Sequence, residues 1–244
     1  MKLSFVIPAY NEEKYIEQCL DSILREIKRS KVDAEVIAVN NASTDKTREI
    51  ILSYPDVLLV DESRKGLAQA RQAGFLASSG EIIANIDADS VLASGWIEKS
   101  IREFSKNKKL VALSGPYIYY DKPLLINGLV WVYYSVGYII HFFTQYVLRK
   151  GAMLQGGNFV LRSSALKKVG GFDVRIGFYG EDTDIAKRIQ KVGQVKFSFF
   201  FSMHTSARRF SEEGFISTAL KYVINYFWVI IFHKPFSKEY NDIR

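Results

Sequence analysis

The chain of 244 residues contains a single cysteine, Cys19, and this scarcity limits what the protein can be. An intramolecular disulfide is excluded, and one lone thiol fits a reducing compartment. Cys19 lies within a helical apolar pattern, which favours a buried packing role over a nucleophile. The first residues also lack the long apolar core of a signal peptide, and Glu12 and Glu13 follow shortly after them. We therefore expect a cytoplasmic protein.

Internal repeats and low-complexity linkers are also missing, so we expect one large domain. Hydrophobic residues make up 48% of the chain and charged residues 24%, which excludes a disordered chain and a multi-span membrane protein. The formal net charge of +7 indicates an anionic partner. The basic residues are scattered, and no compact nucleic-acid-binding signature is present. A membrane surface or a phosphorylated small molecule is therefore the expected partner, and nucleic acid is not.

The first half of the chain alternates short β-branched runs with helical patterns, which is typical of a parallel sheet with crossover helices. Ser43 or Thr44 is expected to cap the second helix. The pattern predicts an α/β fold with a mostly parallel sheet flanked by helices. The expected strands are 3–7, 34–39, 57–60 and 81–86, and the expected helices are 15–27, 45–53 and a third that follows Gly66 and runs through Gly74.

The fourth expected strand ends directly at Asp87-Ala88-Asp89. In open α/β sheets, ligands bind at the carboxyl edge of the strands. Two carboxylates one residue apart repel each other unless a cation or a set of donors lies between them. An isolated Asp-x-Asp is most often a solvated turn or a helix cap. At this position, a divalent metal that also bridges two phosphates is an equally good interpretation.

A second acidic group, Glu181, Asp182 and Asp184, precedes a helical pattern. One interpretation is that these acids interact favourably with the dipole of the helix that they begin. The other is that one of them is a general base, because a hydroxyl group is a poor nucleophile until its proton is removed. Asp184 is expected to face solvent or to support the turn.

Seven short motifs occur in a recognisable order. They are Val6–Glu13, Asn40–Asp45, Gly66–Arg71, Asp87–Asp89, Gly156–Asn158, Gly170–Asp173 and Gly180–Asp182. Each one is a weak signal by itself, but their order makes chance agreement improbable. From Leu3 to Phe210 the chain resembles the family 2 glycosyltransferases, which have the GT-A fold, a Rossmann-like nucleotide-diphospho-sugar transferase architecture. The resemblance implies a transfer of a sugar from a nucleotide-diphosphate donor.

The resemblance also implies roles for single residues. Arg71 would lie near the diphosphate, since a planar cation suits phosphate oxygens. Asp89 would bind a divalent metal, Mn²⁺ or Mg²⁺, with Asp87 close to the ribose or the metal. Asp182 matches the base that deprotonates the acceptor for an inverting displacement, and Glu181 would position the loop or the acceptor. The nucleotide pocket would be lined by Pro8, Ala9, Tyr10, Glu12, Asn40 and Asp45.

Asn40 and Asn41 depart from the family pattern, which has two aspartates in many relatives. An amide oxygen still accepts a hydrogen bond from a base N–H, but the amide group adds donors that a carboxylate lacks. The donor could therefore be a UDP or a GDP sugar, with uridine as the default.

A late basic segment contains three further candidates. The resemblance suggests His204 as an additional metal ligand, although a lone histidine is more often structural. Arg208 and Arg209 resemble an arginine-containing loop that some members close over the diphosphate. They could equally be surface cations.

Two apolar segments, 123–148 and 215–233, are the main features of the second half, and the first has no Asp, Glu, Lys or Arg. The first is long enough to span a bilayer, but a span would divide the expected active site. It could be a buried subdomain, a dimer surface or an interfacial element on the membrane. The nearby tyrosines, together with Arg149, Lys150, Lys234 and Lys238, favour peripheral membrane association and a lipid-linked or glycan acceptor.

We accordingly expect a catalytic domain over 1–210, with an apolar insertion at 123–149, and a C-terminal tail over 211–244 that can contact the membrane. Two other functions are considered. A nucleotidyltransferase would have a glycine-rich basic loop after the first strand, where this chain has Pro8-Ala9-Tyr10-Asn11-Glu12. A non-catalytic nucleotide-sugar or lipid-binding module is disfavoured by the presence of both Asp89 and Asp182.

Overall fold

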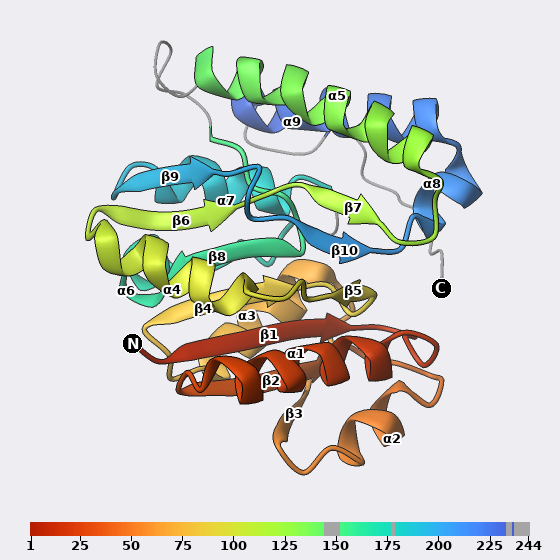
Figure 1. Ribbon diagram of the computed structural model, residues 1–244, viewed down its shortest axis with the longest axis vertical. Helices are drawn as coiled ribbons and strands as arrows, with labels where there is room; N and C mark the ends of the chain where they lie inside the picture. Colours follow the sequence, from red (N-terminus) through yellow and green to blue (C-terminus); the bar gives the residue numbers. More distant parts are fainter. Residues whose placement is uncertain (144–151, 177–178, 233–235, 237–244) are drawn as a thin grey trace.

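The fold is known from a computed structural model, which describes residues 1–143, 152–176, 179–232 and 236. Its main element is a seven-stranded sheet in the order β3-β2-β1-β4-β8-β6-β9 (Figure 1). β8 runs antiparallel to both of its neighbours, and the other pairs are parallel. The predicted mostly parallel α/β fold is confirmed. The strands are β1 Leu3–Ala9, β2 Ala34–Asn40, β3 Val57–Asp61, β4 Ile82–Ile86, β6 Leu110–Ser114, β8 Asn158–Arg162 and β9 Gln194–Phe197.

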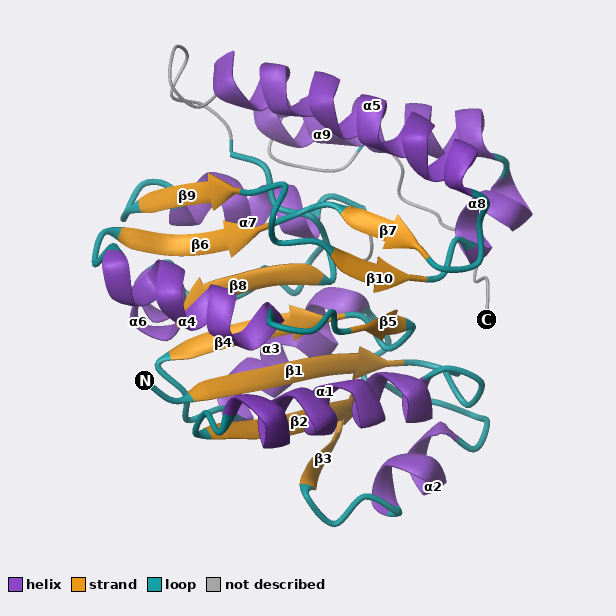
Figure 2. Ribbon diagram, viewed as in Figure 1, coloured by secondary structure: helices purple, strands orange, loops and turns teal. Residues whose placement is uncertain are grey.

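Helices cover both faces of this sheet (Figure 2). One apolar core lies under α1 and α4, and a second lies under α3, α6 and α7. Gly74 allows α3 to approach the sheet closely, because a Cβ at this position would lie 2.3 Å from Cγ1 of Val6. The helices are α1 Ile16–Ser30, α2 Thr47–Leu52, α3 Leu67–Ala77, α4 Trp96–Lys106, α6 Ser163–Lys168 and α7 Glu181–Ile189.

The boundaries of the first half agree with the sequence prediction to within about three residues, but one detail is wrong. α2 begins at Thr47, and neither Ser43 nor Thr44 caps it. The Ser43 hydroxyl instead accepts a hydrogen bond from the backbone N–H of Asn11, and the N–H of Thr44 donates to the Asn11 side chain. These contacts join the loops that follow β1 and β2, which is a tertiary role that a local pattern does not reveal.

A smaller three-stranded sheet extends the molecule beyond the edge where β1 and β4 end. Its order is β5-β10-β7, with β5 at Ser90–Val91, β10 at Met203–Thr205 and β7 at Tyr117–Tyr119. Above it, Figure 1 shows the long helices α5 and α9 at one end of the molecule, with α8 beside them. Their bounds are Leu124–Phe142 for α5, Arg208–Glu213 for α8 and Phe215–Phe232 for α9.

Among the described residues, α5 is the one helix that is long and apolar enough to cross a membrane. The chain before and after α5 nevertheless meets again at the same place. The Tyr117 hydroxyl, in β7, donates a hydrogen bond to the Gly156 carbonyl, which follows the helix. The residues before and after α5 therefore meet in one globular body, and the expectation that this helix does not span stays a prediction. The predicted apolar segment continues to 148, and its last residues lie outside the described part of the chain.

Candidate active site

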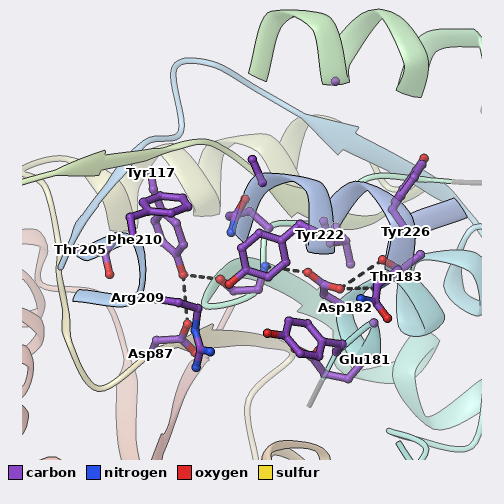
Figure 3. Close-up of a pocket in the computed structure, with 18 of the residues that line it drawn as sticks. Asp87, Tyr117, Glu181, Asp182, Thr183, Thr205, Arg209, Phe210, Tyr222 and Tyr226 are labelled. Carbon is purple, nitrogen blue, oxygen red and sulfur yellow. Dashed lines mark hydrogen bonds between the residues drawn. The ribbon is translucent and has the colours of Figure 1, made fainter. Parts of the chain in front are cut away.

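A cavity of about 510 Å³ lies at the carboxyl edge of the main sheet, beneath α5 and α9. The elements that line it are far apart in sequence. The end of β1 supplies Pro8 and the loop after it supplies Glu12. The turn after β4 supplies Asp87 and Asp89, and the first turn of α7 supplies Glu181 and Asp182. Figure 3 shows several of these side chains pointing into the same space. Arg71 of α3 and Arg208 of α8 complete the charged part of the wall.

Arg71 joins the two acidic groups that the sequence singled out. Its side chain is fully buried, with Nη2 3.1 Å from Oδ1 of Asp87 and Nη1 bonded to Oε1 of Glu181. Its guanidinium also lies over the ring of Phe159, 5.0 Å from the ring centroid. A buried cation held by two carboxylates and a ring fixes the distance between the Asp87 turn and α7. Arg71, which the sequence analysis expected near the diphosphate, pairs in this structure with the carboxylates of Asp87 and Glu181.

Glu181 and Asp182 begin α7 side by side. The Gly156 backbone N–H donates to Oδ2 of Asp182 at 3.1 Å, and the Thr183 N–H donates to Oδ1 at 2.6 Å. Burial raises the pKa of Asp182 above its usual value, while Arg71 acts in the opposite direction. Burial and the Asp182 charge raise the pKa of Glu181. A carboxylate with a raised pKa and a fixed orientation is suited to accept a proton near neutral pH.

Asp89 is paired with Arg208 across a sequence separation of more than a hundred residues. Nε of Arg208 lies 3.0 Å from Oδ2 of Asp89, and its terminal nitrogens form a bidentate pair with Glu12 at 2.5 and 2.8 Å. Burial raises the pKa of Asp89 to about 6, against the lowering effect of Arg208. Thr205 donates a further hydrogen bond to Oδ1 of Asp89 at 3.3 Å. At this mostly buried site one arginine pairs with two carboxylates.

The Gly156-Gly157-Asn158 motif shapes the floor of the site. Gly157 has a φ of +77°, and a Cβ here would lie 2.1 Å from Oδ2 of Asp87, so only glycine leaves room for that carboxylate. The buried Asn158 side chain donates to the carbonyls of Gly115 and Phe201 and accepts from the indole N–H of Trp96. These bonds hold the glycine turn against the end of β8.

Several residues expected at the site stand beside the cavity rather than in its wall. Ala9 is the last residue of β1 and Tyr10 follows it, and the Tyr10 ring lies under the Lys65 ammonium. Asn40 donates a hydrogen bond to Asp61 and accepts one from the Ser43 N–H. Asp45 accepts hydrogen bonds from the N–H groups of Glu13 and Thr47, so it organises the loop. These side chains lie along the carboxyl ends of β1 and β2, next to the charged part of the cavity.

His204 does not reach Asp89 in the structure. Its neighbour Thr205 lines the cavity and contacts Asp89, and adjacent residues of a strand point to opposite faces. No group of three or more His, Cys, Asp or Glu side chains that could hold a metal ion occurs in the described part of the chain. The predicted set of Asp87, Asp89 and His204 is therefore not assembled.

The sequence analysis did not find the tyrosines of the site. The Tyr117 hydroxyl oxygen, which donates to Gly156, also lies 3.2 Å from Oδ2 of Asp87. Tyr133, Tyr134, Tyr222 and Tyr226 line the cavity from α5 and α9. Figure 3 shows the Tyr222 ring beside Asp182, whereas the Tyr226 hydroxyl points away from it. The apolar periodicity of both helices gave no reason to separate these rings from ordinary packing residues.

The helix α9 belongs to the predicted C-terminal tail 211–244, and α8, at Arg208–Glu213, crosses the predicted boundary between catalytic domain and tail.

Comparison with known proteins gives this arrangement a family. The family described as Glycosyl transferase family 2 matches residues 4–170, which is more than half of the chain. The chain belongs to glycosyltransferase family 2. The matched residues include Pro8, Glu12, Arg71, Asp87 and Asp89, whereas Asp182 and Arg208 follow them.

Sequence similarity to a known protein covers more of the chain than the family match does. The chain is 27% identical over 254 residues to a hyaluronan synthase of Pasteurella multocida, a match that covers 91% of this chain and 25% of that protein. The family 2 glycosyltransferase described here thus spans about a quarter of the length of that relative.

Solved structures show the same GT-A fold. A mannosyltransferase from Pyrobaculum calidifontis, in complex with GDP-Man and Mn²⁺, superimposes with a TM-score of 0.63 at 23% identity, covering 84% of this chain and 56% of that one. The S. aureus protein TarS, residues 1–349 in complex with UDP, gives a TM-score of 0.65 at 16% identity, covering 98% and 68%.

The residues present fit a divalent cation that arrives with a diphosphate. Mg²⁺ and similar ions are commonly held by one or two carboxylates together with substrate phosphates, rather than by a cage made only of protein. Asp89 and Asp87 provide two carboxylates at the cavity edge, and Asp89 is already compensated by a cation, Arg208. A third protein ligand is not needed for this kind of site.

Proposed function

We propose that the protein is an inverting, metal-dependent glycosyltransferase that moves a sugar from a nucleotide-diphosphate sugar to a hydroxyl or phosphate acceptor. The observation that carries this proposal is the single cavity that joins Asp89 to Asp182. One end offers carboxylates for a metal-bound diphosphate, and the other offers a fixed base. The similar structures with GDP-Man and with UDP support a GDP or UDP sugar as the donor.

Different residues would bind the metal, bind the nucleotide and accept the proton. Asp89, with Asp87, would hold a divalent cation, Mn²⁺ or Mg²⁺, which supplies positive charge to the departing diphosphate when it is bound. Pro8 and Glu12 begin the nucleotide pocket, which continues along Ala9, Tyr10, Asn40 and Asp45. Asp182 takes the proton of the acceptor hydroxyl, and the acceptor oxygen bonds to the anomeric carbon. The bond from that carbon to the β-phosphate oxygen breaks, and the nucleoside diphosphate keeps the electron pair.

Thermal unfolding with a panel of nucleoside diphosphates tests the donor site. We expect one nucleotide to raise the unfolding midpoint by several degrees in Mn²⁺ or Mg²⁺, and a chelator to remove the shift, since a ligand that binds only the folded state stabilises it by mass action. Asp89→Asn should lose the shift, and Asp184→Asn, outside the cavity, should keep it. If no nucleotide shifts the midpoint, with or without vesicles, the donor proposal is wrong.

We also propose that the protein works at the cytosolic face of a membrane, through the outer faces of α5 and α9. Exposed apolar side chains follow one stripe on each helix, at intervals of three and four residues. The cations expected to flank them, Arg149, Lys150, Lys234 and Lys238, lie outside the described residues. On α5 the stripe contains Leu125, Leu129, Val132, Val136 and Ile139, and on α9 it contains Leu220, Ile224, Phe227 and Ile231.

Flotation tests this contact. We expect the protein to float with vesicles that contain anionic lipid, and Leu129→Asp combined with Val132→Asp to reduce the floating fraction several-fold, because charged side chains resist transfer into the interface. Leu52→Asp, at an exposed apolar residue of α2, is the matched control and should leave flotation unchanged. Protein that stays out of the vesicle fraction would contradict the membrane proposal.

A further inference from the structure

The cavity has a second, apolar end, and its walls identify the class of acceptor. Among the residues that line the cavity, α5 contributes Val130, Val136 and Ile140, and α9 contributes Val223 and Phe227. Val136 and Phe227 are 53% and 39% exposed although they line the cavity, so they mark the place where it meets the outer surface. That surface carries the apolar stripes of the same two helices. An apolar passage therefore runs from the base to the outer face of the helix pair.

The walls of this passage suit hydrocarbon. Burial of apolar surface against aliphatic side chains is favourable by about 25 cal/mol per Å², whereas a glycan would need polar partners for its hydroxyl groups. The amide of Asn225, which also lines the cavity, donates to the Lys221 carbonyl and accepts from the Phe236 N–H. The remaining polar groups of α5 and α9 in the wall are the hydroxyls of Tyr133, Tyr134, Tyr222 and Tyr226, and that of Tyr134 already donates to the Gln155 side chain.

The charged residues around Asp182 indicate which head group a lipid acceptor would have. Among the described residues, the cations that line the cavity are Arg71, Arg208 and Arg209. Arg71 is held by Asp87 and Glu181, and Arg208 by Asp89 and Glu12. Arg209 is paired with Glu213 at 3.2 Å. A phosphate head beside Asp182 would face that carboxylate while Arg71 is held by Asp87 and Glu181, and like charges disfavour each other in a buried site.

We propose that the acceptor is a lipid with an uncharged hydroxyl head, whose chain lies between α5 and α9 and whose hydroxyl group meets Asp182. This inference rests on the proposed function and makes its acceptor specific. Asp182 receives the hydroxyl proton, the lipid oxygen becomes bonded to the anomeric carbon of the sugar, and the nucleoside diphosphate leaves with the electrons of the broken bond. A phosphate-headed lipid would already be an anion and would need no base.

Calorimetric binding of three soluble probes tests the acceptor class without relying on turnover. We expect 1-decanoylglycerol, below its critical micelle concentration, to bind the full chain, and decyl phosphate of the same chain length to bind at least ten times more weakly. Maltotriose should not bind. Asp182→Asn should strengthen the binding of decyl phosphate, since it removes one of the repelling charges.

Two neighbouring isoleucines of α5 provide a matched pair. Ile140 lines the cavity, whereas Ile139 is 68% exposed and does not. We expect Ile140→Asp to weaken decanoylglycerol binding at least tenfold and Ile139→Asp to change it less than twofold. Val223→Asp tests the opposite wall, on α9, if Ile140→Asp fails to fold. A retained thermal shift with nucleotide shows that a variant is folded.

Three results would overturn the inference. They are decyl phosphate binding as tightly as decanoylglycerol, maltotriose binding where decanoylglycerol does not, and unchanged decanoylglycerol binding in both cavity-wall variants. A normal nucleotide shift alongside any of these results leaves the proposed function standing and removes only the lipid acceptor. Loss of the nucleotide shift in the parent protein removes the proposed function itself.

Discussion

Replacing Asp182 with Asn should lower kcat by a factor of about 10² to 10⁴, the range that a positioned general base contributes. The amide cannot accept the acceptor proton, although it can still be held by the N–H groups of Gly156 and Thr183. Binding of the donor nucleotide should persist, because the nucleotide contacts are expected at the other end of the cavity. Steady-state kinetics together with the nucleotide-dependent thermal shift measure both parts.

Asp184→Asn is the matched control. Asp184 lies two residues further along α7, where it pairs with Arg188 at 2.6 Å and does not line the cavity. We expect its kcat to stay within about threefold of the parent value. The pH profile gives a second readout. Since burial raises the pKa of Asp182, parent activity should fall on acidification at a pH above the ordinary aspartate value of about 4. Full activity in Asp182→Asn would exclude the base role.

Replacing Arg208 with Gln should destabilise the fold by about 3 kcal/mol at pH 7 to 8, because removal of one partner leaves buried charges without compensation. Glu12 and Asp89 have side-chain exposures of 4% and 12%, so solvent cannot replace the lost cation fully. For a chain of this length, the unfolding midpoint should fall by roughly 6 to 12 °C. Mn²⁺ without nucleotide should recover part of this loss in the variant and change the parent much less, since Arg208 occupies Asp89 in the parent.

The pH dependence of this loss has a defined sign. Asp89 has a pKa of about 6 in the folded protein, above its unfolded value, so the folded state binds its proton more tightly. Loss of Arg208 removes its lowering effect, so the pKa of Asp89 in the variant lies above that of the parent. The penalty should therefore be largest well above pH 6 and should shrink as the pH falls toward 6. Arg209→Gln is the matched control, because Glu213 keeps its pairing with Lys221 at 3.0 Å. Equal responses of both variants to Mn²⁺ would argue against a cation site at Asp89.

Local patterns in the sequence were enough to predict the layout of the first half. Alternating apolar runs gave β1 to β4 and the helices between them, since side-chain periodicity follows directly from strand and helix geometry. The end of an apolar strand at Asp87 was enough to predict an acidic turn at the ligand-binding edge of the sheet. Seven ordered motifs indicated the family. These features depend on neighbours in sequence or on a chain order that is visible in it.

Tertiary structure alone decided how these residues meet. The sequence could not show that Arg71 binds Asp87 and Glu181, because its partners are 16 and 110 residues away. It could not show that Arg208 pairs with Asp89, or that Thr205 contacts Asp89, because both contacts depend on how β10 and α8 lie against the Asp87–Asp89 turn. The sequences of the two apolar segments are equally compatible with packing inside the protein and with contact to a membrane. Only the fold shows that one side of α5 and α9 lines the cavity that contains Asp182 while the other faces outward, since a side chain's environment depends on what folds against it.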